Sequence, residues 1–187
     1  MTIASPPRRT PQDLEADGKG FELVDGEFLE KPMMAKSGSE TAMLLGGELA
    51  IFLKRKPIAR LYSSEQGFQC FRSTGDVDRV RKPDISVVLN DRVAADASHE
   101  GWFFIRPDIA IEIISTNDKA TQLVRKLKDY VAASIPLVWV IYPDEQRVEI
   151  HRAGATSVQV LGVDGILDGE TILPGMAIKI ADILPAR

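Results

Sequence analysis

Two acidic side chains stand in apolar segments where a carboxylate is costly. Glu112 interrupts residues 107–115, a run that is β-branched and apolar on both faces, as is typical of a strand covered on both sides. Asp84 stands near the start of a second such run, residues 83–89. An ionised carboxylate in these surroundings needs a neutralising cation. Because two acids on neighbouring strands can share one metal ion, the sequence predicts a divalent-metal site at Asp84 and Glu112.

A row of polar side chains is expected beside these acids. Counting 100° per residue, Gln122, Lys126 and Tyr130 form one row of a predicted helix over residues 119–134. Lys126 can reach back toward Glu112 while its stem covers apolar surface. The alternative is that Glu112 is neutral, or is ion-paired with a basic neighbour, and has no chemical role. The neighbouring stripe of this helix is expected to be buried and contains Ala120, Leu123, Leu127 and Val131.

The N-terminal third predicts a hairpin followed by a helix. Asp25-Gly26 supplies the positive-φ pair of a type I′ turn between residues 21–24 and 27–29. Ser37 and Glu40 have the spacing of a capping box, and Pro57 ends the helical pattern. Gly46-Gly47 lies inside this helix, where two glycines cost stability. Their presence indicates that another element approaches the helix closely.

The remaining elements predict one α/β domain with a mixed sheet flanked by helices. Residues 20–187 are expected to form this domain, and residues 1–19 a loose tail. Thr116, Asn117 or Asp118 is expected to cap the helix over residues 119–134. The expected strands are residues 61–71 (one strand or two), 83–89, 108–115, 137–142, 147–152 and several short strands in 157–184.

Composition excludes several classes of protein. No stretch of the 187 residues approaches the roughly 18 apolar residues of a membrane span, and the N-terminus has no signal-like apolar region. We therefore expect a cytoplasmic protein. The net charge of −4 argues against a protein that coats nucleic acid non-specifically. Cys70, His99 and His151 have no partners at metal-ligand or catalytic-triad spacing.

The ordered motifs resemble the putative restriction endonuclease family of the PD-(D/E)XK nuclease superfamily. The resemblance rests on Pro83-Asp84, on Glu112 within residues 107–115 and on Lys126-Leu127 with Tyr130. The strand over residues 138–143, the opening hairpin and the closing Leu173-Pro174-Gly175 also match. Together they cover residues 20–184, so the set is more specific than any single motif. The resemblance implies a restriction-endonuclease-like fold with an extra N-terminal hairpin and C-terminal short strands.

The chain departs from the superfamily pattern at its lysine. That lysine would stand two residues after the acid, where this chain has Ile114. Lys126 on the following helix is the expected replacement. The turn after the acidic strand is Ser115-Thr116-Asn117-Asp118, where the family has Ser-Pro-Ser-Asp, a change that keeps a helix cap.

The resemblance implies metal-dependent hydrolysis of phosphodiester bonds in nucleic acid, with DNA the expected substrate. Asp84, Glu112 and the carbonyl of Ile113 would hold Mg²⁺ or Mn²⁺. Lys126 would orient the attacking water or neutralise developing charge. The secondary candidates are Glu22, Glu40, Gln122 and Tyr130, although a hairpin surface residue and a cap are equally good interpretations of Glu22 and Glu40. Arg81 and Lys82 are weaker candidates for phosphate contact, with a solvated loop as the alternative.

A second function class remains open at this point. A nuclease-fold module that binds nucleic acid or protein without cutting would also suit the acidic net charge. The intact set of Asp84, Glu112 and Lys126 argues against it. A homodimer is a further expectation from the resemblance alone.

Overall fold

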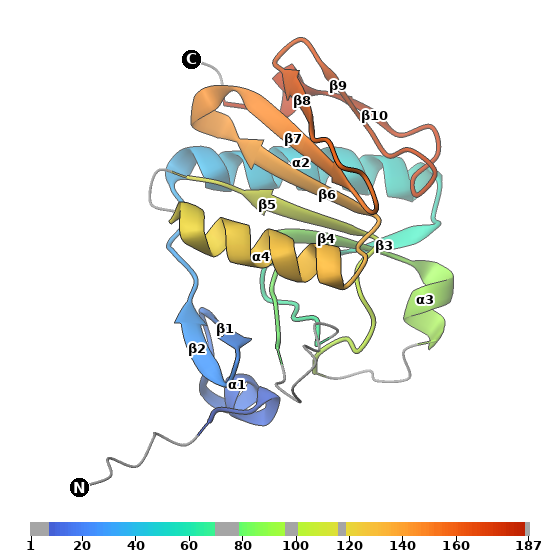
Figure 1. Cartoon of the computed structure of the whole chain (residues 1–187). Coiled ribbons are helices and arrows are strands. Elements are labelled where there is room, and N and C mark those ends of the chain that lie inside the picture. Colours follow the sequence, from blue (N-terminus) through green and yellow to red (C-terminus); the bar gives the residue numbers. More distant parts are fainter. Residues whose placement is uncertain (1–7, 70–78, 96–100, 116–118, 186–187) are drawn as a thin grey trace, which may run out of the picture.

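A six-stranded mixed sheet forms the centre of the protein, with helices on both faces (Figure 1). The computed structural model describes residues 8–69, 79–95, 101–115 and 119–185. The strand order is β3-β4-β5-β6-β7-β8, with β5 and β6 parallel and the other neighbours antiparallel. The strands are β3 (Ala59–Ser63), β4 (Ile85–Leu89), β5 (Ile109–Ile113), β6 (Leu137–Tyr142), β7 (Arg147–Arg152) and β8 (Gln159–Gly162).

Two further strand pairs stand apart from this sheet. The N-terminal hairpin joins β1 (Phe21–Val24) to β2 (Glu27–Glu30). Asp25 and Gly26 both have positive φ, as the type I′ turn requires. Near the C-terminus, β9 (Ile166–Asp168) pairs with β10 (Ala177–Lys179). The α/β class, the mixed sheet, the extra hairpin and the short C-terminal strands are thus confirmed.

Helices lie on both faces of the sheet, and the strand connections explain their positions. Parallel pairing of β5 and β6 requires a crossover, and α4 (Ala120–Ala132) provides it across one face. Helix α2 (Lys36–Arg55) lies on the opposite face (Figure 1). The shorter helical segments are α1 (Pro11–Asp17), α3 (Asn90–Ala95), the 3₁₀ turn η1 (Pro143–Glu145) and α5 (Ile180–Ile183).

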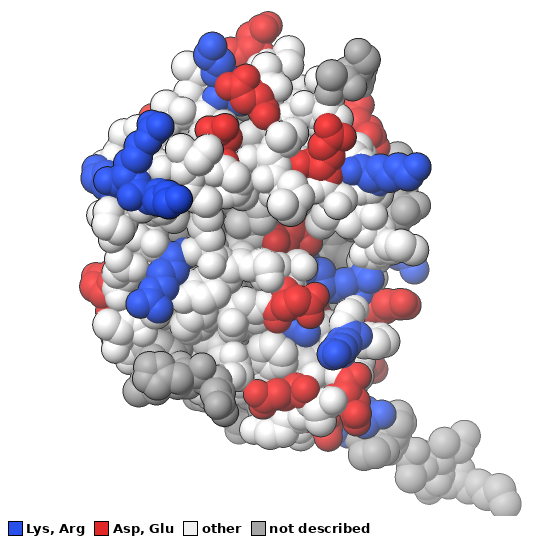
Figure 2. All heavy atoms as spheres, turned by 180° about the vertical axis from the view of Figure 1, so that it is seen from behind, with Lys and Arg blue, Asp and Glu red and all other residues white. Residues whose placement is uncertain are grey.

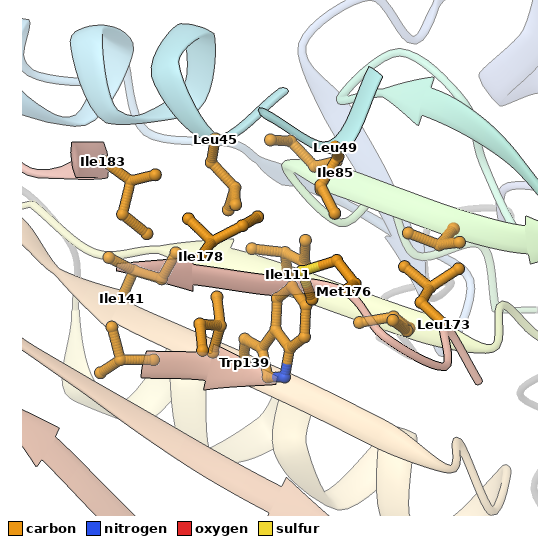
Figure 3. Close-up of a cluster of buried hydrophobic side chains, with 14 of the residues drawn as sticks. Leu45, Leu49, Ile85, Ile111, Trp139, Ile141, Leu173, Met176, Ile178 and Ile183 are labelled. Atoms are coloured by element: carbon orange, nitrogen blue, oxygen red, sulfur yellow. The ribbon is translucent and has the colours of Figure 1, made fainter. Parts of the chain in front are cut away.

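The main core fills the space between the sheet and α2. Leu45 and Leu49 of α2 meet Ile111 and Trp139 of the central strands. The C-terminal segments close the same layer with Met176, Ile178 and Ile183, among others, as Figure 3 shows. All of these side chains are buried. This face of the sheet is therefore an uninterrupted apolar layer.

The α4 face has a different composition. Alternation along the strands places Ala110 and Glu112 there, opposite Val138 and Val140 in the parallel register. A smaller apolar cluster forms around Phe68, Val88 and Tyr130. Glu112 adjoins this cluster and is only 3% exposed. Glu112 therefore lies beneath the crossover helix, as expected from the sequence.

The predicted buried stripe of α4 was correct only in part, at Leu123 and Leu127, and was wrong at Ala120 and Val131. Val131 is 73% exposed, and Asp129 and Tyr130 are the buried residues of the helix. Leu123 and Leu127 are only partly buried. The helix is rotated so that Lys126 and Tyr130 point toward the sheet, because they bond to Glu112 there. The expected caps Thr116, Asn117 and Asp118 lie outside the described residues.

Three expectations for the N-terminal part need correction. The capping box at Ser37 and Glu40 is absent, because α2 begins at Lys36 and Ala35 is its N-cap. The close approach expected at Gly46-Gly47 is absent at Gly47, where an added methyl group would meet nothing within 4 Å among the described residues. At Gly46 it would meet only Ile85 of β4, at 4.0 Å, which is an ordinary contact. Residues 8–19 are not a loose tail, because Thr10 caps α1 and Leu14 is buried with Leu23.

Candidate functional site

A pocket is lined by residues of α4, the β1–β2 hairpin and the ends of β4 and β5. Figure 1 shows where these elements lie in the fold. The pocket's cavity volume of about 60 Å³ leaves room for several water-sized groups. The charged side chains that line it come from separate segments of the chain and include Glu22, Lys31, Asp84, Glu112 and Lys126. The sheet, the helix and the hairpin therefore meet at a single ionic cluster.

Glu112 is held at the floor of this pocket by two side chains of α4. Lys126 Nζ donates to Glu112 Oε2 at 2.8 Å, and the Tyr130 hydroxyl donates to Glu112 Oε1. Lys126 and Tyr130 lie four residues apart and so share one face of the helix. Both oxygens of the carboxylate are thus hydrogen-bonded, and their orientation is fixed.

Asp84 is tied to the end of β5 and to a lysine that follows the hairpin. Its Oδ2 accepts a hydrogen bond from the backbone N–H of Ile113 at 2.8 Å. Its Oδ1 lies 3.2 Å from Lys31 Nζ, which also donates to the Lys82 carbonyl at 2.7 Å. Asp84 therefore stands beside the residue that follows Glu112, and each of the two acids has its own ammonium partner.

Glu22 connects the hairpin to both lysine and arginine. Its Oε1 lies 3.1 Å from Lys126 Nζ and accepts the backbone N–H of Lys82 at 2.8 Å. Its Oε2 accepts from Arg81 at 2.9 Å. Glu22 is buried, so the interpretation of Glu22 as a hairpin surface residue was wrong. Lys126 is shared between two carboxylates, Glu22 and Glu112.

A second ionic group joins α4 to the segment before β4 and to the hairpin turn. Arg81 Nε donates to Asp129 Oδ2 at 2.7 Å, and Arg79 also pairs with Asp129. Arg79 reaches Asp25 in the hairpin turn as well, at 2.9 Å from Nε. Buried charges need such partners, because leaving one of them unpaired costs several kcal/mol, about 3–5 in typical cases. This network holds the hairpin and α4 in register over the sheet.

Burial and neighbouring charges shift the pKa values of the cluster. Burial raises the pKa of Glu112, and the Asp84 and Glu22 carboxylates add to that rise against the opposing effect of Lys126. Burial alone would lower the pKa of Lys126, but Glu112, Glu22 and Asp84 outweigh it and raise that pKa. Burial and Glu112 raise the pKa of Tyr130 well above its usual value. Lys126 therefore stays an ammonium, and Tyr130 stays a hydrogen-bond donor.

The structure brings most of the sequence-derived candidates together. Gln122 and Ile113 line the pocket along with Asp84, Glu112 and Lys126. Tyr130 reaches it through Glu112. Glu40 does not belong to this group, since it is exposed on α2 and does not line the pocket.

The alternative that Arg81 and Lys82 lie on a solvated loop was wrong. Arg81 is 2% exposed and Lys82 3% exposed. Arg81 is occupied by Glu22 and Asp129, while Lys82 Nζ lies 4.8 Å from the centre of the Trp102 ring. Burial lowers the pKa of Lys82. The exposed cations at the pocket are instead Lys119 and Arg125.

Lys31 and Asp129 are the participants that the sequence did not indicate. Lys31 is separated from Asp84 by 53 residues, and Asp129 from Arg81 by 48. Both are polar residues in ordinary surroundings, so no local pattern marks them. Their pairing depends on where the hairpin and α4 lie relative to the sheet.

Comparison with known proteins identifies the family. Residues 9–181 match the family model described as "Uma2: Putative restriction endonuclease". The chain belongs to the Uma2 family. Its fold is also that of a solved Anabaena variabilis protein, titled a "putative nuclease belonging to DUF820", with a TM-score of 0.78. The two are 22% identical, and the match covers 95% of this chain and 97% of that one. No curated protein matches the chain.

Membership of the Uma2 family supports a nuclease function for the protein. It agrees with the resemblance inferred from the sequence motifs. Among the described residues, no helix is long and apolar enough to cross a membrane.

Proposed function

We propose that this Uma2 protein is a metal-dependent endonuclease that hydrolyses phosphodiester bonds of DNA. The single observation that carries the proposal is the bonding of Lys126 to Glu112 in the same pocket as Asp84. This arrangement supplies two hard oxygen ligands and one fixed positive charge. Such a set suits phosphoryl transfer, where positioning and charge neutralisation account for most of the catalysis.

The residues present fit a hydrated divalent cation. Mg²⁺ commonly keeps several waters and is held by one or two carboxylates, so Asp84 and Glu112 with the Ile113 carbonyl are a sufficient set. The described residues contain no cluster of three or more acidic, histidine or cysteine side chains that could hold a metal, so the proposed ion would depend on these two carboxylates, one carbonyl and water. Bound there, Mg²⁺ or Mn²⁺ would polarise the phosphate and acidify a water molecule.

The protein residues have distinct roles in this proposal. Lys126 neutralises charge that develops on the phosphate or orients the attacking water. Tyr130 and Lys126 together fix both oxygens of Glu112. Glu22 holds the Lys126 ammonium from the hairpin side at 3.1 Å and is a positioning residue. Gln122 lies one turn before Lys126 and faces the same pocket, where it can contact the substrate.

The substrate's phosphates are proposed to contact Lys119 and Arg125. These side chains are exposed at the pocket, unlike Arg81 and Lys82. With a net charge of −4, the chain attracts nucleic acid only through such local cations. Binding and cleavage should therefore weaken as salt screens these few contacts.

One observation favours the alternative of a module that binds without cutting. Lys31 and Lys126 already neutralise Asp84 and Glu112 within the described residues, so the acids do not require a metal for their burial. Under that alternative the cluster only joins the hairpin, α4 and the sheet.

Cleavage assays distinguish the two functions. Plasmid, linear duplex and single-stranded DNA, and RNA, are incubated with Mg²⁺, Mn²⁺ or EDTA over a range of salt. The proposal predicts cleavage of DNA that EDTA abolishes and salt weakens. Cleavage that persists in EDTA contradicts metal dependence. Lack of cleavage on every substrate, with wild type and Glu112→Gln binding them equally, favours the non-cutting module.

A further inference from the structure

Helix α2 exposes an apolar stripe on the side that faces away from the sheet. Met43 is 75% exposed and Ile51 50% exposed, and Leu44 is also exposed beside them. Gly47 and Ala50 lie between these residues and are exposed as well. Seen from behind the sheet in Figure 2, the middle of this face carries mostly uncharged side chains. The stripe does not line the pocket of the candidate site.

The spacing along this stripe is that of a helix–helix seam. Counting from Glu40, successive steps of three, four, three and four residues reach Lys54. That is the repeat that keeps one side of a helix facing a partner helix. The residues on this row are Glu40, Met43, Gly47, Ala50 and Lys54.

Gly47 stands at the midpoint of the row and has open space around it. A Cβ at this position would meet nothing within 4 Å. A glycine in an exposed helix interior costs about 1 kcal/mol relative to alanine, and the fold of a single chain gains nothing from it here. A glycine at a helix crossing, in contrast, allows two helix backbones to approach closely.

The charges at the two ends of the row are complementary about Gly47. Glu40 lies seven residues before Gly47, and Lys54 lies seven residues after it. Neither side chain makes an ion pair or side-chain hydrogen bond within the part of the chain that the structure describes. If a second α2 crosses antiparallel at Gly47, each Glu40 meets the Lys54 of the other copy. Met43 then meets Ile51, and Leu44 meets Ala50.

We propose that α2 is the interface of a two-fold symmetric homodimer, in which the helices of two copies pack antiparallel and cross at Gly47. Such an isologous contact uses one self-complementary patch on both copies. A helix of 20 residues is about 30 Å long, and one of its faces provides less than the roughly 800 Å² per partner of a standard interface. The dimer is therefore weak, with a dissociation constant in the micromolar range.

Sedimentation velocity from low micromolar to several hundred micromolar protein tests this interface. Gly47→Lys should raise the dimer dissociation constant at least about tenfold, because it fills the crossing point and places two like charges on the two-fold axis. The same variant should raise the melting temperature of the monomer, because lysine has the higher helix propensity. Val131→Lys, which replaces an exposed apolar residue on α4, is the matched control and should leave dimerisation unchanged.

Charge exchange tests the antiparallel arrangement. Glu40→Lys and Lys54→Glu should each weaken the dimer, and the double variant should restore it, because the pairs then re-form with reversed signs. A monomer at all concentrations overturns the proposal. So does a dimer that persists in Gly47→Lys or dissociates in Val131→Lys, because its interface then lies elsewhere. None of these measurements uses nuclease activity, so their outcome is independent of the proposed function.

Discussion

The two faces of the central sheet differ in composition, since one is covered by apolar side chains and the other includes buried charges. On the α2 face, Leu45, Leu49, Ile111 and Trp139 belong to a continuous apolar core. On the α4 face, the buried layer includes Glu112 and the ionic pairs around it. Apolar burial stabilises by about 25 cal/mol per Å², whereas a buried ion pair often adds nothing beyond a hydrophobic replacement.

Under the proposed function, one face provides most of the stability and the other provides the chemistry. The charged groups of the α4 face are costly to bury and need several partners, which is typical of a functional site. The apolar α2 face supports strands β4 and β5 from behind, and these strands hold Asp84 and Glu112 in place. Substitutions on the two faces should therefore separate stability from activity.

The largest expected effect on stability is from the α2 face. Trp139→Ala should lower the free energy of unfolding by about 3–5 kcal/mol, the usual loss for a buried aromatic residue. Glu112→Gln on the other face should lower it by less than that, because the amide keeps the shape and Lys126 keeps the Glu22 carboxylate as a partner at 3.1 Å. Urea unfolding measures both. If Trp139→Ala does not fold, Ile111→Val replaces it with an expected loss of about 0.5–1.5 kcal/mol.

Equal losses for Trp139→Ala and Glu112→Gln would break the comparison between the faces. The ionic cluster would then contribute as much to the free energy of unfolding as the apolar core does.

The next largest effect is expected on the rate of DNA cleavage, from a substitution on the α4 face. Lys126→Met keeps the aliphatic stem and should lower the rate of DNA cleavage by about 10²-fold or more, the typical loss of one transition-state charge stabiliser. Lys128→Met is the matched control, because Lys128 is exposed and lies about 200° around the helix from Lys126. Single-turnover cleavage rates distinguish the two. Equal rates for both variants would remove Lys126 from the catalytic group.

A smaller effect is expected at Lys31. Its ammonium lies 3.2 Å from Asp84 and must compete with a metal for that carboxylate. Lys31→Met should therefore tighten Mn²⁺ binding by about fivefold, corresponding to about 1 kcal/mol for a partly exposed pair. Calorimetric titration measures the change, with Lys36→Met on the exposed start of α2 as the control. Weaker binding in Lys31→Met would mean that Lys31 positions Asp84 for the metal instead of competing with it.

The smallest effect tests the rotation of α4. Val131→Ala should change the free energy of unfolding by less than about 0.5 kcal/mol, because Val131 is exposed. Leu127→Ala should cost more, because Leu127 packs against the smaller apolar cluster. Thermal unfolding of the two variants compares them. A larger loss from Val131→Ala would restore the stripe that the sequence predicted.

Local patterns predicted the fold better than they predicted the site. The strands over residues 85–89 and 109–113 follow from runs rich in β-branched residues, and the hairpin follows from Asp25-Gly26. These signals lie within a few residues of one another. The rotation of α4 could not be read in this way, because the apolar stripe was assumed to face the sheet. Polar Lys126 and Tyr130 face it beside the partly buried Leu123 and Leu127, and their partner Glu112 is distant in sequence.

The same limit explains which site residues were found. Asp84 and Glu112 could be recognised in the sequence because an acidic residue is unusual in an apolar strand. Glu22, which had two interpretations in the sequence, gained its role only when the hairpin was placed beside α4. Lys31 conflicts with nothing locally, so its pairing with Asp84 is a property of the assembled fold.

Metal binding by Asp84 and Glu112 is the central claim, and calorimetric titration with Mn²⁺ or Mg²⁺ tests it most directly. Wild type should bind the ion, Glu112→Gln should lose that binding, and Glu48→Gln, which alters an exposed acid of α2, should keep it. The thermal unfolding of all three proteins without metal verifies that each is folded. Equal metal binding by wild type and Glu112→Gln would contradict the claim.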